Sequence, residues 1–416
     1  WLRWAGIEVQ GPIIDTMIAA PLLNENRLFY NLNSLSKEYL GETKNEKMLR
    51  AAAEMYGVDA KSGMWQLDSS FVGRYAEQDA AVTLRLWDRL RIDIVAEECS
   101  SIFQLESSLL PVLLDMKQRG VRVDTDKAEQ VKKELLSREK TLLKEIKEET
   151  GVTVEPWVAT SVAKAFDSLG LKYHRTEKTD APAFTKQFLA NHEHPIAKKI
   201  VRLREFNKAN TTFVETILEH SHNGRIHCDF NPLRSDEGGT VTGRFSSSNP
   251  NLQQIPARDP EIKAMIRGLF IPEEGHKWGS FDYASQEPRW LAHYCAQIKG
   301  ANRSPEIDEV VEMYKSGNAD FHQMVADMAG ISRKEAKTVN LGIMYGMGRK
   351  KLAGVLDVTE DEAKSLLSKY HEHVPFVKGI ADMTMNHAGD KGSIRTILGR
   401  KCRFDRWEPR SFGFHK

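Results

Sequence analysis

The sequence predicts a protein of the α/β (α+β) class with about two to three domains, and three observations support this prediction. The 416 residues exceed the roughly 150 residues of an ordinary domain. Apolar residues recur at helical spacing over residues 100–150 and again over 305–390. Between these regions, from about 225 to 300, short β-like runs alternate with turn residues.

The composition is that of a globular protein and excludes several other classes. Charged residues make up 28% and apolar residues 41%, which excludes collagen-like, disordered and disulfide-dense proteins. The four cysteines are widely scattered, so neither disulfides nor a zinc site is indicated. No apolar run approaches the roughly 20 residues that span a bilayer, and no signal peptide is visible. We therefore expect a cytoplasmic protein with no membrane partner.

The net charge leaves the choice of partner open. The 59 basic and 58 acidic residues give a net charge of +1, which neither predicts nor forbids a polyanionic partner. Basic residues are concentrated in residues 198–210 and 396–416. Such runs are usually solvated faces, so they permit nucleic-acid binding without requiring it.

Three long helices are predicted in the first 150 residues. Residues 71–90 carry an apolar stripe, and the stripe over residues 102–116 ends at Gly120, as a helix C-terminus would. Asp124 or Thr125 can cap the third helix, which runs to about Thr150. This helix is heavily charged, and its roughly 25 residues reach about 37 Å, so it should stand out from the body as an arm.

Four β-like runs follow, each bounded by turn residues. They read GRIHCDFN (224–231), GTVTGRFSSS (239–248), IRGLFI (266–271) and KWGSFDY (277–283). A helix is expected over residues 285–298, directly after the last run.

Asp282 lies at the end of the last predicted strand and just before the helix. Rigid backbone on both sides can aim such a carboxylate into a cleft, with Glu287 and Arg289 near the same opening. A helix-capping aspartate explains the same position, and this segment alone does not distinguish the two.

A second group of residues lies along one predicted helix. Ser332 and Glu335 form a capping box, and four side chains then recur every four residues, within a strip of roughly 120°. Two cations, an apolar side chain and an aromatic ring in this order suit a nucleoside triphosphate lying along the helix. The alternative is an amphipathic core helix with basic residues at one end. The four residues are Arg333, Lys337, Leu341 and Tyr345.

The segment TVTGRFSSSNPNLQQIP (240–256) offers many hydrogen-bond donors and few charges. This suits the edge of a nucleic-acid groove better than a grip on phosphate, although a polar loop with turn residues has a similar composition. The presence of all three segments in one chain favours the functional interpretation.

These segments resemble the motifs of the family A DNA polymerases, the DNA polymerase I-like group. DYASQEPR (282–289) resembles motif A, RKEAKTVNLGIMYG (333–346) resembles motif B, and TVTGRFSSSNPNLQQIP resembles a third signature. DMKQRGVRVD (115–124), NADFHQM (318–324) and TILGRKCRF (396–404) also match the family. The resemblance covers essentially the whole chain.

The resemblance implies a right-hand polymerase of palm, fingers and thumb, preceded by the C-terminal part of a ribonuclease H-like 3′-5′ exonuclease domain. It assigns residues 1–95 to the partial exonuclease and 96–235 to the thumb and the start of the palm. It further assigns 236–300 to the palm with motif A, 301–395 to the fingers with motif B, and 396–416 to the return to the palm.

The resemblance also implies a function, template-directed DNA synthesis for replication, with primer-template DNA and dNTPs as partners. Asp282 and a backbone carbonyl at Tyr283 would hold Mg²⁺, one of two ions in the complete enzyme, and Lys337 would be catalytic. The dNTP would contact Arg258, Glu287, His322, Arg333, Lys337, Leu341 and Tyr345, with Glu287 and Tyr345 excluding a ribose 2′-hydroxyl. Primer and template would contact Arg244, Asn251, Gln253 and Arg289.

The ends of the chain lead to further expectations. GRYAEQDAAVT (73–83) resembles the third exonuclease motif, with Tyr75 and Asp79 one helical turn apart. The first two exonuclease motifs and the His-Asp-Glu motif that supplies the second catalytic aspartate are missing from this sequence. We therefore expect a piece of a longer polymerase that is inactive by itself in proofreading and in synthesis; primer extension by the 416-residue chain would contradict this.

Two departures from the family pattern matter. Leu341 stands where the family usually has an aromatic residue, so we expect altered sugar handling, which restoring Phe would test. Pro288 in motif A resembles phage-encoded members, which would place the protein in the host cytoplasm. The alternatives are a single-subunit RNA polymerase and a degenerate DNA-binding module. The sequence indicates no particular replisome partner, and the pairs His192/His194 and His371/His373 are expected at the surface rather than at a metal.

Overall fold

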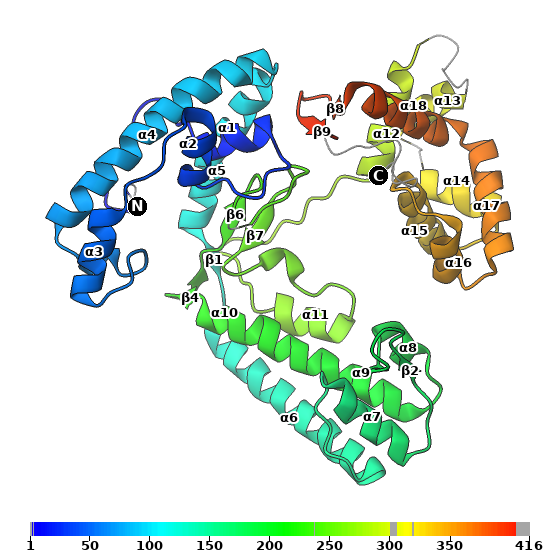
Figure 1. The fold of residues 1–416 in the computed structure, drawn as a ribbon. Helices are drawn as coiled ribbons and strands as arrows, with labels where there is room; N and C mark the ends of the chain where they lie inside the picture. The colour runs from blue at the N-terminus through cyan, green and yellow to red at the C-terminus, as the bar shows by residue number, and fades with distance from the viewer. Residues whose placement is uncertain (1, 3, 237, 300–305, 318–319, 405–416) are drawn as a thin grey trace. The chain divides into compact units, whose positions relative to one another are not determined.

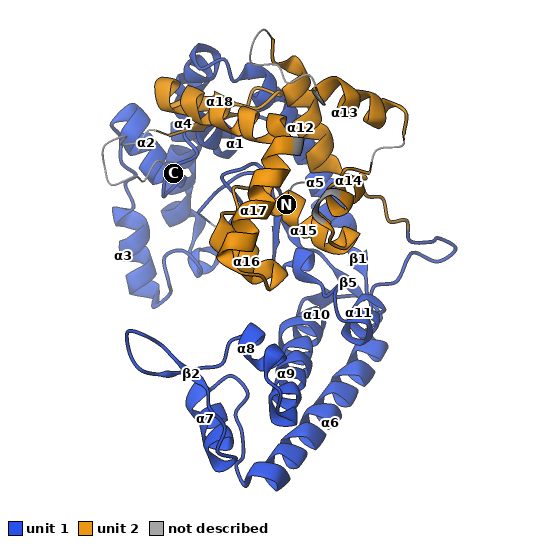
Figure 2. Cartoon of the chain, turned by 90° about the vertical axis from the view of Figure 1, so that its right-hand side faces the viewer, with its two compact units in different colours: residues 1–278 blue, residues 279–416 orange. Residues whose placement is uncertain are grey.

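The computed structural model describes residues 2, 4–236, 238–299, 306–317 and 320–404 (Figure 1). The chain divides into two compact units, residues 1–278 and 279–416 (Figure 2). The predicted palm segment, residues 236–300, is thus divided between them. The basic residues at positions 405–416 lie outside the described residues.

Unit 1 begins with helices, and they bury the second half of the stripe predicted for residues 71–90. Leu86, Leu90 and Ile94 on the long helix α4 are buried against α1, α2 and α5. Among the described residues no strand precedes Val121. The part of the chain that was predicted to end an α/β domain therefore contains helices and no strand within these residues. The elements are α1 (Thr16–Leu23), α2 (Leu32–Leu40), α3 (Lys47–Tyr56), η1 (Met64–Gln66), α4 (Ser69–Ala96) and α5 (Ser100–Arg119).

A small antiparallel sheet links these helices to the predicted arm. Helix α5 ends at Gly120, as predicted, and this residue has a φ of 64°, which glycine adopts without strain. Strand β1 (Val121–Arg122) pairs with β5 (Arg225–Ile226), and β5 pairs with β4 (Ser221–His222), giving the order β1-β5-β4.

The predicted long helix is α6 (Thr125–Thr150), and Asp124 caps it by accepting a hydrogen bond from the Lys127 amide at 2.9 Å. Of its narrow predicted stripe, Val131, Leu135 and Ile146 are buried and Leu142 is half-buried, and the rest of its surface is largely exposed. Figure 1 shows α6 running beside the returning helix α9 to a small subdomain at the tip. The other elements are α7 (Ala159–Ser168), β2 (His174–Arg175), β3 (Pro182–Ala183), α8 (Lys186–Asn191), α9 (Pro195–Lys208), the π-helical turn η2 (Ala209–Val214) and α10 (Glu215–Glu219).

Two of the four predicted strands are found and two are wrong. Strand β6 (Asp229–Asn231) pairs with β7 (Ser246–Ser248), and η3 (Leu252–Gln254) follows. The run 266–271 is not a strand, because Asp259 caps α11 (Pro260–Arg267), which buries Ile262 and Ile266 on one face. Only Phe270 of this run forms a bridge, with Val123.

The run 277–283 is extended but pairs with no strand among the described residues. Phe281 is 97% exposed and Trp278 is 60% exposed. A strand needs a neighbour to pair its backbone groups, and a local sequence pattern cannot show whether one is available.

Unit 2 is helical, as predicted, and is built around one apolar core. Tyr370 and Val374 are fully buried at its centre, with Val339 and Phe376 packed nearby. No described helix in either unit combines the length and apolar character needed to cross a membrane. The elements are α12 (Gln286–Gln297), α13 (Glu306–Lys315), α14 (Phe321–Ala329), α15 (Arg333–Met344), α16 (Arg349–Leu356), α17 (Glu360–His373), α18 (Pro375–Lys391), β8 (Ser393–Arg395) and β9 (Lys401–Arg403).

Replacing Arg202 with alanine is expected to lower the free energy of unfolding by about 1–2 kcal/mol. Arg202 joins α9 to the start of α11, because it donates to Asp259 at 2.9 Å and also pairs with Glu261. Without the guanidinium, Asp259 loses this ion pair, and Glu261 keeps only its pair with Arg138 among the described residues. Urea unfolding measures the loss, and Arg175→Ala is the control, since Arg175 pairs with a largely exposed Asp180 and should cost about 0.5 kcal/mol or less. Equal losses in the two variants would contradict this role.

Candidate functional site

Helix α15 presents the predicted strip of side chains on its exposed side. The capping box is present: the Ser332 hydroxyl accepts from the Glu335 amide at 3.2 Å, and the Glu335 carboxylate accepts from the Ser332 amide at 2.8 Å. Arg333, Lys337 and Tyr345 are exposed, and Leu341 is half-buried. The side of α15 that packs into the core carries Ala336, Val339, Asn340 and Ile343, so the strip itself is not a core face.

Three predicted dNTP-binding residues, Glu287, Arg333 and Lys337, lie within electrostatic range of a fourth, His322. This side chain, on α14, is only 4% exposed, and burial lowers its pKa. The cations Arg333 and Lys337 lower that pKa further, whereas Asp320 and Glu287 act in the opposite direction. Helices α12 and α15, together with the residue that precedes α14, thus place charged groups within electrostatic range of one ring.

Asp320 is a neighbour of this group that the sequence reasoning missed. Its carboxylate accepts from the Arg333 side chain at 2.7 Å and from the Gln323 amide at 3.0 Å, which caps α14. The hydrogen bond from Arg333 holds the pKa of Asp320 below its usual range. An aspartate just before a predicted helix was a usable signal for the cap, but its pairing with Arg333 is tertiary. One N–H of Arg333 is therefore already occupied.

Asp282 lies in the extended segment before α12, and its side chain is exposed, as are those of Phe281 and Tyr283. Helix α12 begins at Gln286 with Ser285 at its N-cap position, so Asp282 is not the helix cap that the alternative interpretation required. The described residues contain no group of three histidine, cysteine, aspartate or glutamate side chains that could hold a metal ion. Asp282 alone does not make a metal site.

Arg289, a predicted primer-template residue, has partners within unit 2. It donates to the Ala284 carbonyl at 2.9 Å, and its guanidinium lies 4.9 Å from the centre of the Tyr314 ring. Burial raises the pKa of Tyr314 to about 12, with Arg289 acting against the rise. Arg289 therefore ties the turn after Asp282 to α13.

The other predicted DNA contacts and the predicted dNTP-binding residue Arg258 lie in unit 1, close together in sequence after β6. Arg244 and Arg258 are exposed. The Asn251 side chain accepts from the Gln253 amide at 3.0 Å, and the Gln253 side chain donates to the Phe245 carbonyl at 3.0 Å. The side chains of Asn251 and Gln253 are thus exposed, and both also stabilise the loop around η3.

The predicted exonuclease pair, Tyr75 and Asp79, is found one turn apart on α4 with a lysine bound to it. Lys44 donates to the Asp79 carboxylate at 2.7 Å and to the Tyr75 hydroxyl at 3.0 Å. The side chain of Lys44 also lines a cavity of about 520 Å³ together with Lys47 and Lys61. Since a lysine neutralises Asp79 and no further carboxylate joins it among the described residues, this pair does not fit a metal ion here.

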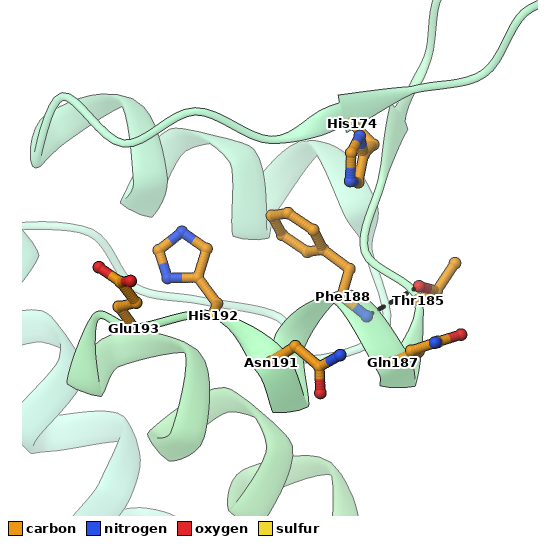
Figure 3. A pocket seen from close by; sticks show the side chains of 7 residues that line it. All are labelled: His174, Thr185, Gln187, Phe188, Asn191, His192 and Glu193. Atoms are coloured by element: carbon orange, nitrogen blue, oxygen red, sulfur yellow. Dashed lines mark hydrogen bonds between the residues drawn. The ribbon is translucent and has the colours of Figure 1, made fainter. Parts of the chain in front are cut away.

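The first histidine pair, His192 and His194, has structural partners. The His194 ring accepts from the Ile196 amide at 3.2 Å and caps α9, while the His192 ring accepts from the His194 amide at 3.1 Å. Figure 3 shows the pocket of about 540 Å³ beside them, where Phe188 lies between His174 and His192. The centroid of the Phe188 ring lies 4.8 Å from that of His174 and 5.4 Å from that of His192, which indicates aromatic packing.

Lowering the pH is expected to destabilise the chain through two histidines of unit 2. Burial lowers the pKa of both His322 and His371 from the ordinary 6.5, and Lys378 contributes at His371, where Asp382 opposes it. Below 6.5 the unfolded chain therefore binds protons that the folded chain rejects, so stability falls as the pH decreases through this value.

Urea midpoints at about pH 7.5 and pH 5.5 measure this effect. The variant His371→Gln removes one of the two titrating groups, so its stability should fall less between these values. A pH dependence identical to that of the unsubstituted chain would contradict the assignment. His371 was expected at the surface; it is half-buried, and its Nδ1 has no hydrogen-bond partner among the described residues.

Comparisons with known proteins agree with the motifs. The sequence profile of DNA polymerase family A matches residues 125–413, and that of a 3′-5′ exonuclease matches residues 1–94. The chain is 35% identical to a DNA-directed DNA polymerase of Pseudomonas phage M6, over 94% of this chain and 66% of that protein. It is 31% identical to the DNA polymerase DpoZ of Acinetobacter phage SH-Ab 15497, over 97% of this chain and 72% of that protein.

Bacterial relatives and one solved structure extend the comparison. The chain is 29% identical to DNA polymerase I of Bacillus subtilis, over 96% of this chain and 44% of that protein. The fold resembles the POL domain of Pol1 from M. smegmatis, determined with DNA primer-template and dNTP, with a TM-score of 0.78. That likeness covers 99% of this chain and 68% of the other at 23% identity, so it concerns the fold.

Proposed function

The chain belongs to DNA polymerase family A, and we propose that it serves template-directed DNA synthesis, in which a deoxynucleotide is added to the 3′-hydroxyl of a primer strand. Such a reaction consists mainly of positioning and electrostatic stabilisation. It requires a grip on the triphosphate, a carboxylate near the reacting atoms and a surface for the primer-template duplex. The relatives of phage and bacterial origin support a cytoplasmic setting, that of the host if the protein is phage-encoded.

The exposed strip of α15 is the observation that carries this proposal. Arg333 and Lys337 lie near the N-terminal end of the helix, where the helix dipole also favours an anion. His322 is within electrostatic range of both cations. Charge-assisted hydrogen bonds from these groups suit the three phosphates of a dNTP, and Lys337 would stabilise the charge that develops during transfer.

The sugar and base would then lie toward the C-terminal end of the same strip. Tyr345 is 67% exposed, and Leu341 provides a smaller, half-buried apolar surface before it. Glu287 on α12 is the acidic neighbour of His322 that would meet a ribose 2′-hydroxyl unfavourably. We expect Leu341→Phe to alter dideoxynucleotide acceptance, because a flat ring contacts the sugar differently.

Asp282, with the backbone carbonyl of Tyr283, is the proposed contribution of this chain to a divalent ion, and the ion we propose is Mg²⁺. Arg244, Asn251 and Gln253 are proposed to contact the minor groove of the primer-template duplex, and Arg289 is proposed to support the motif A turn. Because Lys44 occupies Asp79, we propose no proofreading role for the pair Tyr75 and Asp79.

A binding experiment tests the proposal without requiring turnover. The 416-residue chain is mixed with a fluorescent primer-template whose primer ends in a dideoxynucleotide, and anisotropy is measured at increasing concentrations of each dNTP, with Mg²⁺ and with EDTA. We expect the dNTP complementary to the first template base to stabilise the complex more than the other three. A complementary rNTP should be weaker, since Glu287 is proposed to exclude the 2′-hydroxyl.

The other functions predict different results. A single-subunit RNA polymerase would prefer the complementary rNTP. A non-catalytic DNA-binding module would bind the duplex with no dependence on any nucleotide. Either result would refute the proposed function.

A further inference from the structure

Asn340 is a polar side chain in the apolar interior of unit 2. It is fully buried, on the side of α15 that also carries Ala336, Val339 and Ile343. A buried amide is unfavourable unless it makes hydrogen bonds, so its partners indicate why a polar residue is present. Its Nδ2 lies 3.4 Å from the backbone oxygen of Phe321 and 3.1 Å from Nδ1 of His322.

These two contacts fix which end of the amide faces the histidine. A backbone carbonyl oxygen accepts hydrogen bonds and never donates, so the group next to Phe321 must be the NH₂ of Asn340. The same nitrogen faces His322 Nδ1, and it can donate there only if Nδ1 carries a lone pair. A neutral ring with this lone pair has its proton on Nε2.

The charges around His322 favour the same neutral ring. Arg333 and Lys337 on α15 oppose a second proton, and so does burial of the ring; Asp320 and Glu287 favour one. Within the described residues Nε2 has no hydrogen-bond partner, so its N–H is a donor that no protein group uses.

We propose that Asn340 is a positioning residue that holds His322 with its proton on Nε2, and that this N–H is the donor His322 offers to an oxygen of the bound triphosphate. The second part of this inference rests on the proposed function; the first part does not. Arg333 and Lys337 supply the positive charge, while His322 supplies a directed donor that keeps its form across neutral pH. The chemistry of the ligand is that of a nucleoside triphosphate.

Nitrogen-15 NMR of histidine-labelled chain tests the first part. The signal of His322 is identified by its loss in His322→Gln, and its nitrogen shifts distinguish a proton on Nε2 from one on Nδ1. We expect Nε2–H in the unsubstituted chain. In Asn340→Asp the carboxylate accepts from Nδ1, so we expect a proton to appear on Nδ1. A proton on Nδ1 in the unsubstituted chain, or no change in Asn340→Asp, would refute the positioning role.

Anisotropy with the complementary dNTP tests the second part. Asn340→Leu, which removes the hydrogen bond at similar volume, should weaken dNTP binding by about tenfold, close to the loss in His322→Gln. It should have little further effect when combined with His322→Gln. If Asn340→Leu does not fold, Asn340→Asp serves in its place, where an unchanged affinity would contradict the inference.

The matched control is Asn210→Leu in unit 1. Asn210 is 2% exposed, and its Nδ2 donates to Glu215 at 3.4 Å, so the substitution removes a comparably buried amide. It should change neither the His322 shifts nor the dNTP affinity; equal losses in Asn210→Leu and Asn340→Leu would refute the specific role. If neither the unsubstituted chain nor any variant responds to a dNTP, the proposed function fails. The NMR result alone then decides whether Asn340 positions His322.

Discussion

Replacing Lys337 with alanine is expected to weaken the binding of the complementary dNTP to the chain and its primer-template by about 10- to 100-fold. Each charge-assisted hydrogen bond contributes about 1.5–3 kcal/mol, and tenfold in affinity corresponds to about 1.4 kcal/mol. Lys337 is exposed and makes no ion pair with any described residue, so no internal partner competes with the phosphates for its charge. The anisotropy titration with the complementary dNTP measures the loss.

Lys334→Ala is the matched control for this prediction. Lys334 is an exposed lysine on the same turn of α15, but it lies outside the strip of residues spaced by four. Lys334→Ala changes the net charge by the same amount as Lys337→Ala, so a general electrostatic effect would weaken dNTP binding equally in both variants. An equal loss would therefore contradict a specific contact at Lys337.

Arg333 should behave differently from Lys337 because it is already paired. Its ion pair with Asp320 must loosen or share its donors when a triphosphate arrives. Both side chains are about half exposed, at 54% and 41%, so the pair itself is weak. The expected loss in Arg333→Ala is consequently smaller than that in Lys337→Ala.

The helices that position this site were predictable because their signals are local. Ser332 and Glu335 lie three residues apart, and Asp124 lies directly before the helix that it caps, so a short window contains the complete interaction. The alignment of the four strip residues along one side of α15 also follows from spacing alone. Whether this side is exposed or buried does not, because that depends on helices α14 and α16 packing against α15.

The wrong strands and the missed residues have a common physical cause. A short run with β-forming residues, such as residues 277–283, becomes a strand only if another segment pairs with it, and the sequence of the run does not contain that segment. For the same reason, the contact of Asn340 with His322, 18 residues away, was not visible. The motif resemblance indicated that the segments carrying Asn340 and His322 both matter. It did not indicate that the Asn340 amide fixes the position of the proton on the His322 ring.

Replacing Gly239 with alanine is expected to lower the free energy of unfolding by about 2–4 kcal/mol, the largest stability effect we predict. Gly239 has a φ of +87°, and an added Cβ would lie 1.9 Å from the Leu233 carbonyl oxygen. This neighbour is backbone and cannot rotate away. Leu233 is buried in the core with Leu86 and Leu90, so moving its backbone disturbs that core as well.

The same substitution is expected to reduce primer-template affinity, because this loop leads to Arg244. The amide of Gly239 donates to the Ser246 hydroxyl at 3.1 Å, which joins the loop to β7. Gly41→Ala is the control: its φ is +70° and nothing lies within 4 Å of an added Cβ, so it carries backbone strain of about 1–2 kcal/mol without the collision. Urea unfolding followed by tryptophan fluorescence measures the loss of stability in each variant. Anisotropy on the primer-template measures the loss of affinity. If both variants lose the same stability, the close approach to Leu233 is not what requires glycine at this position.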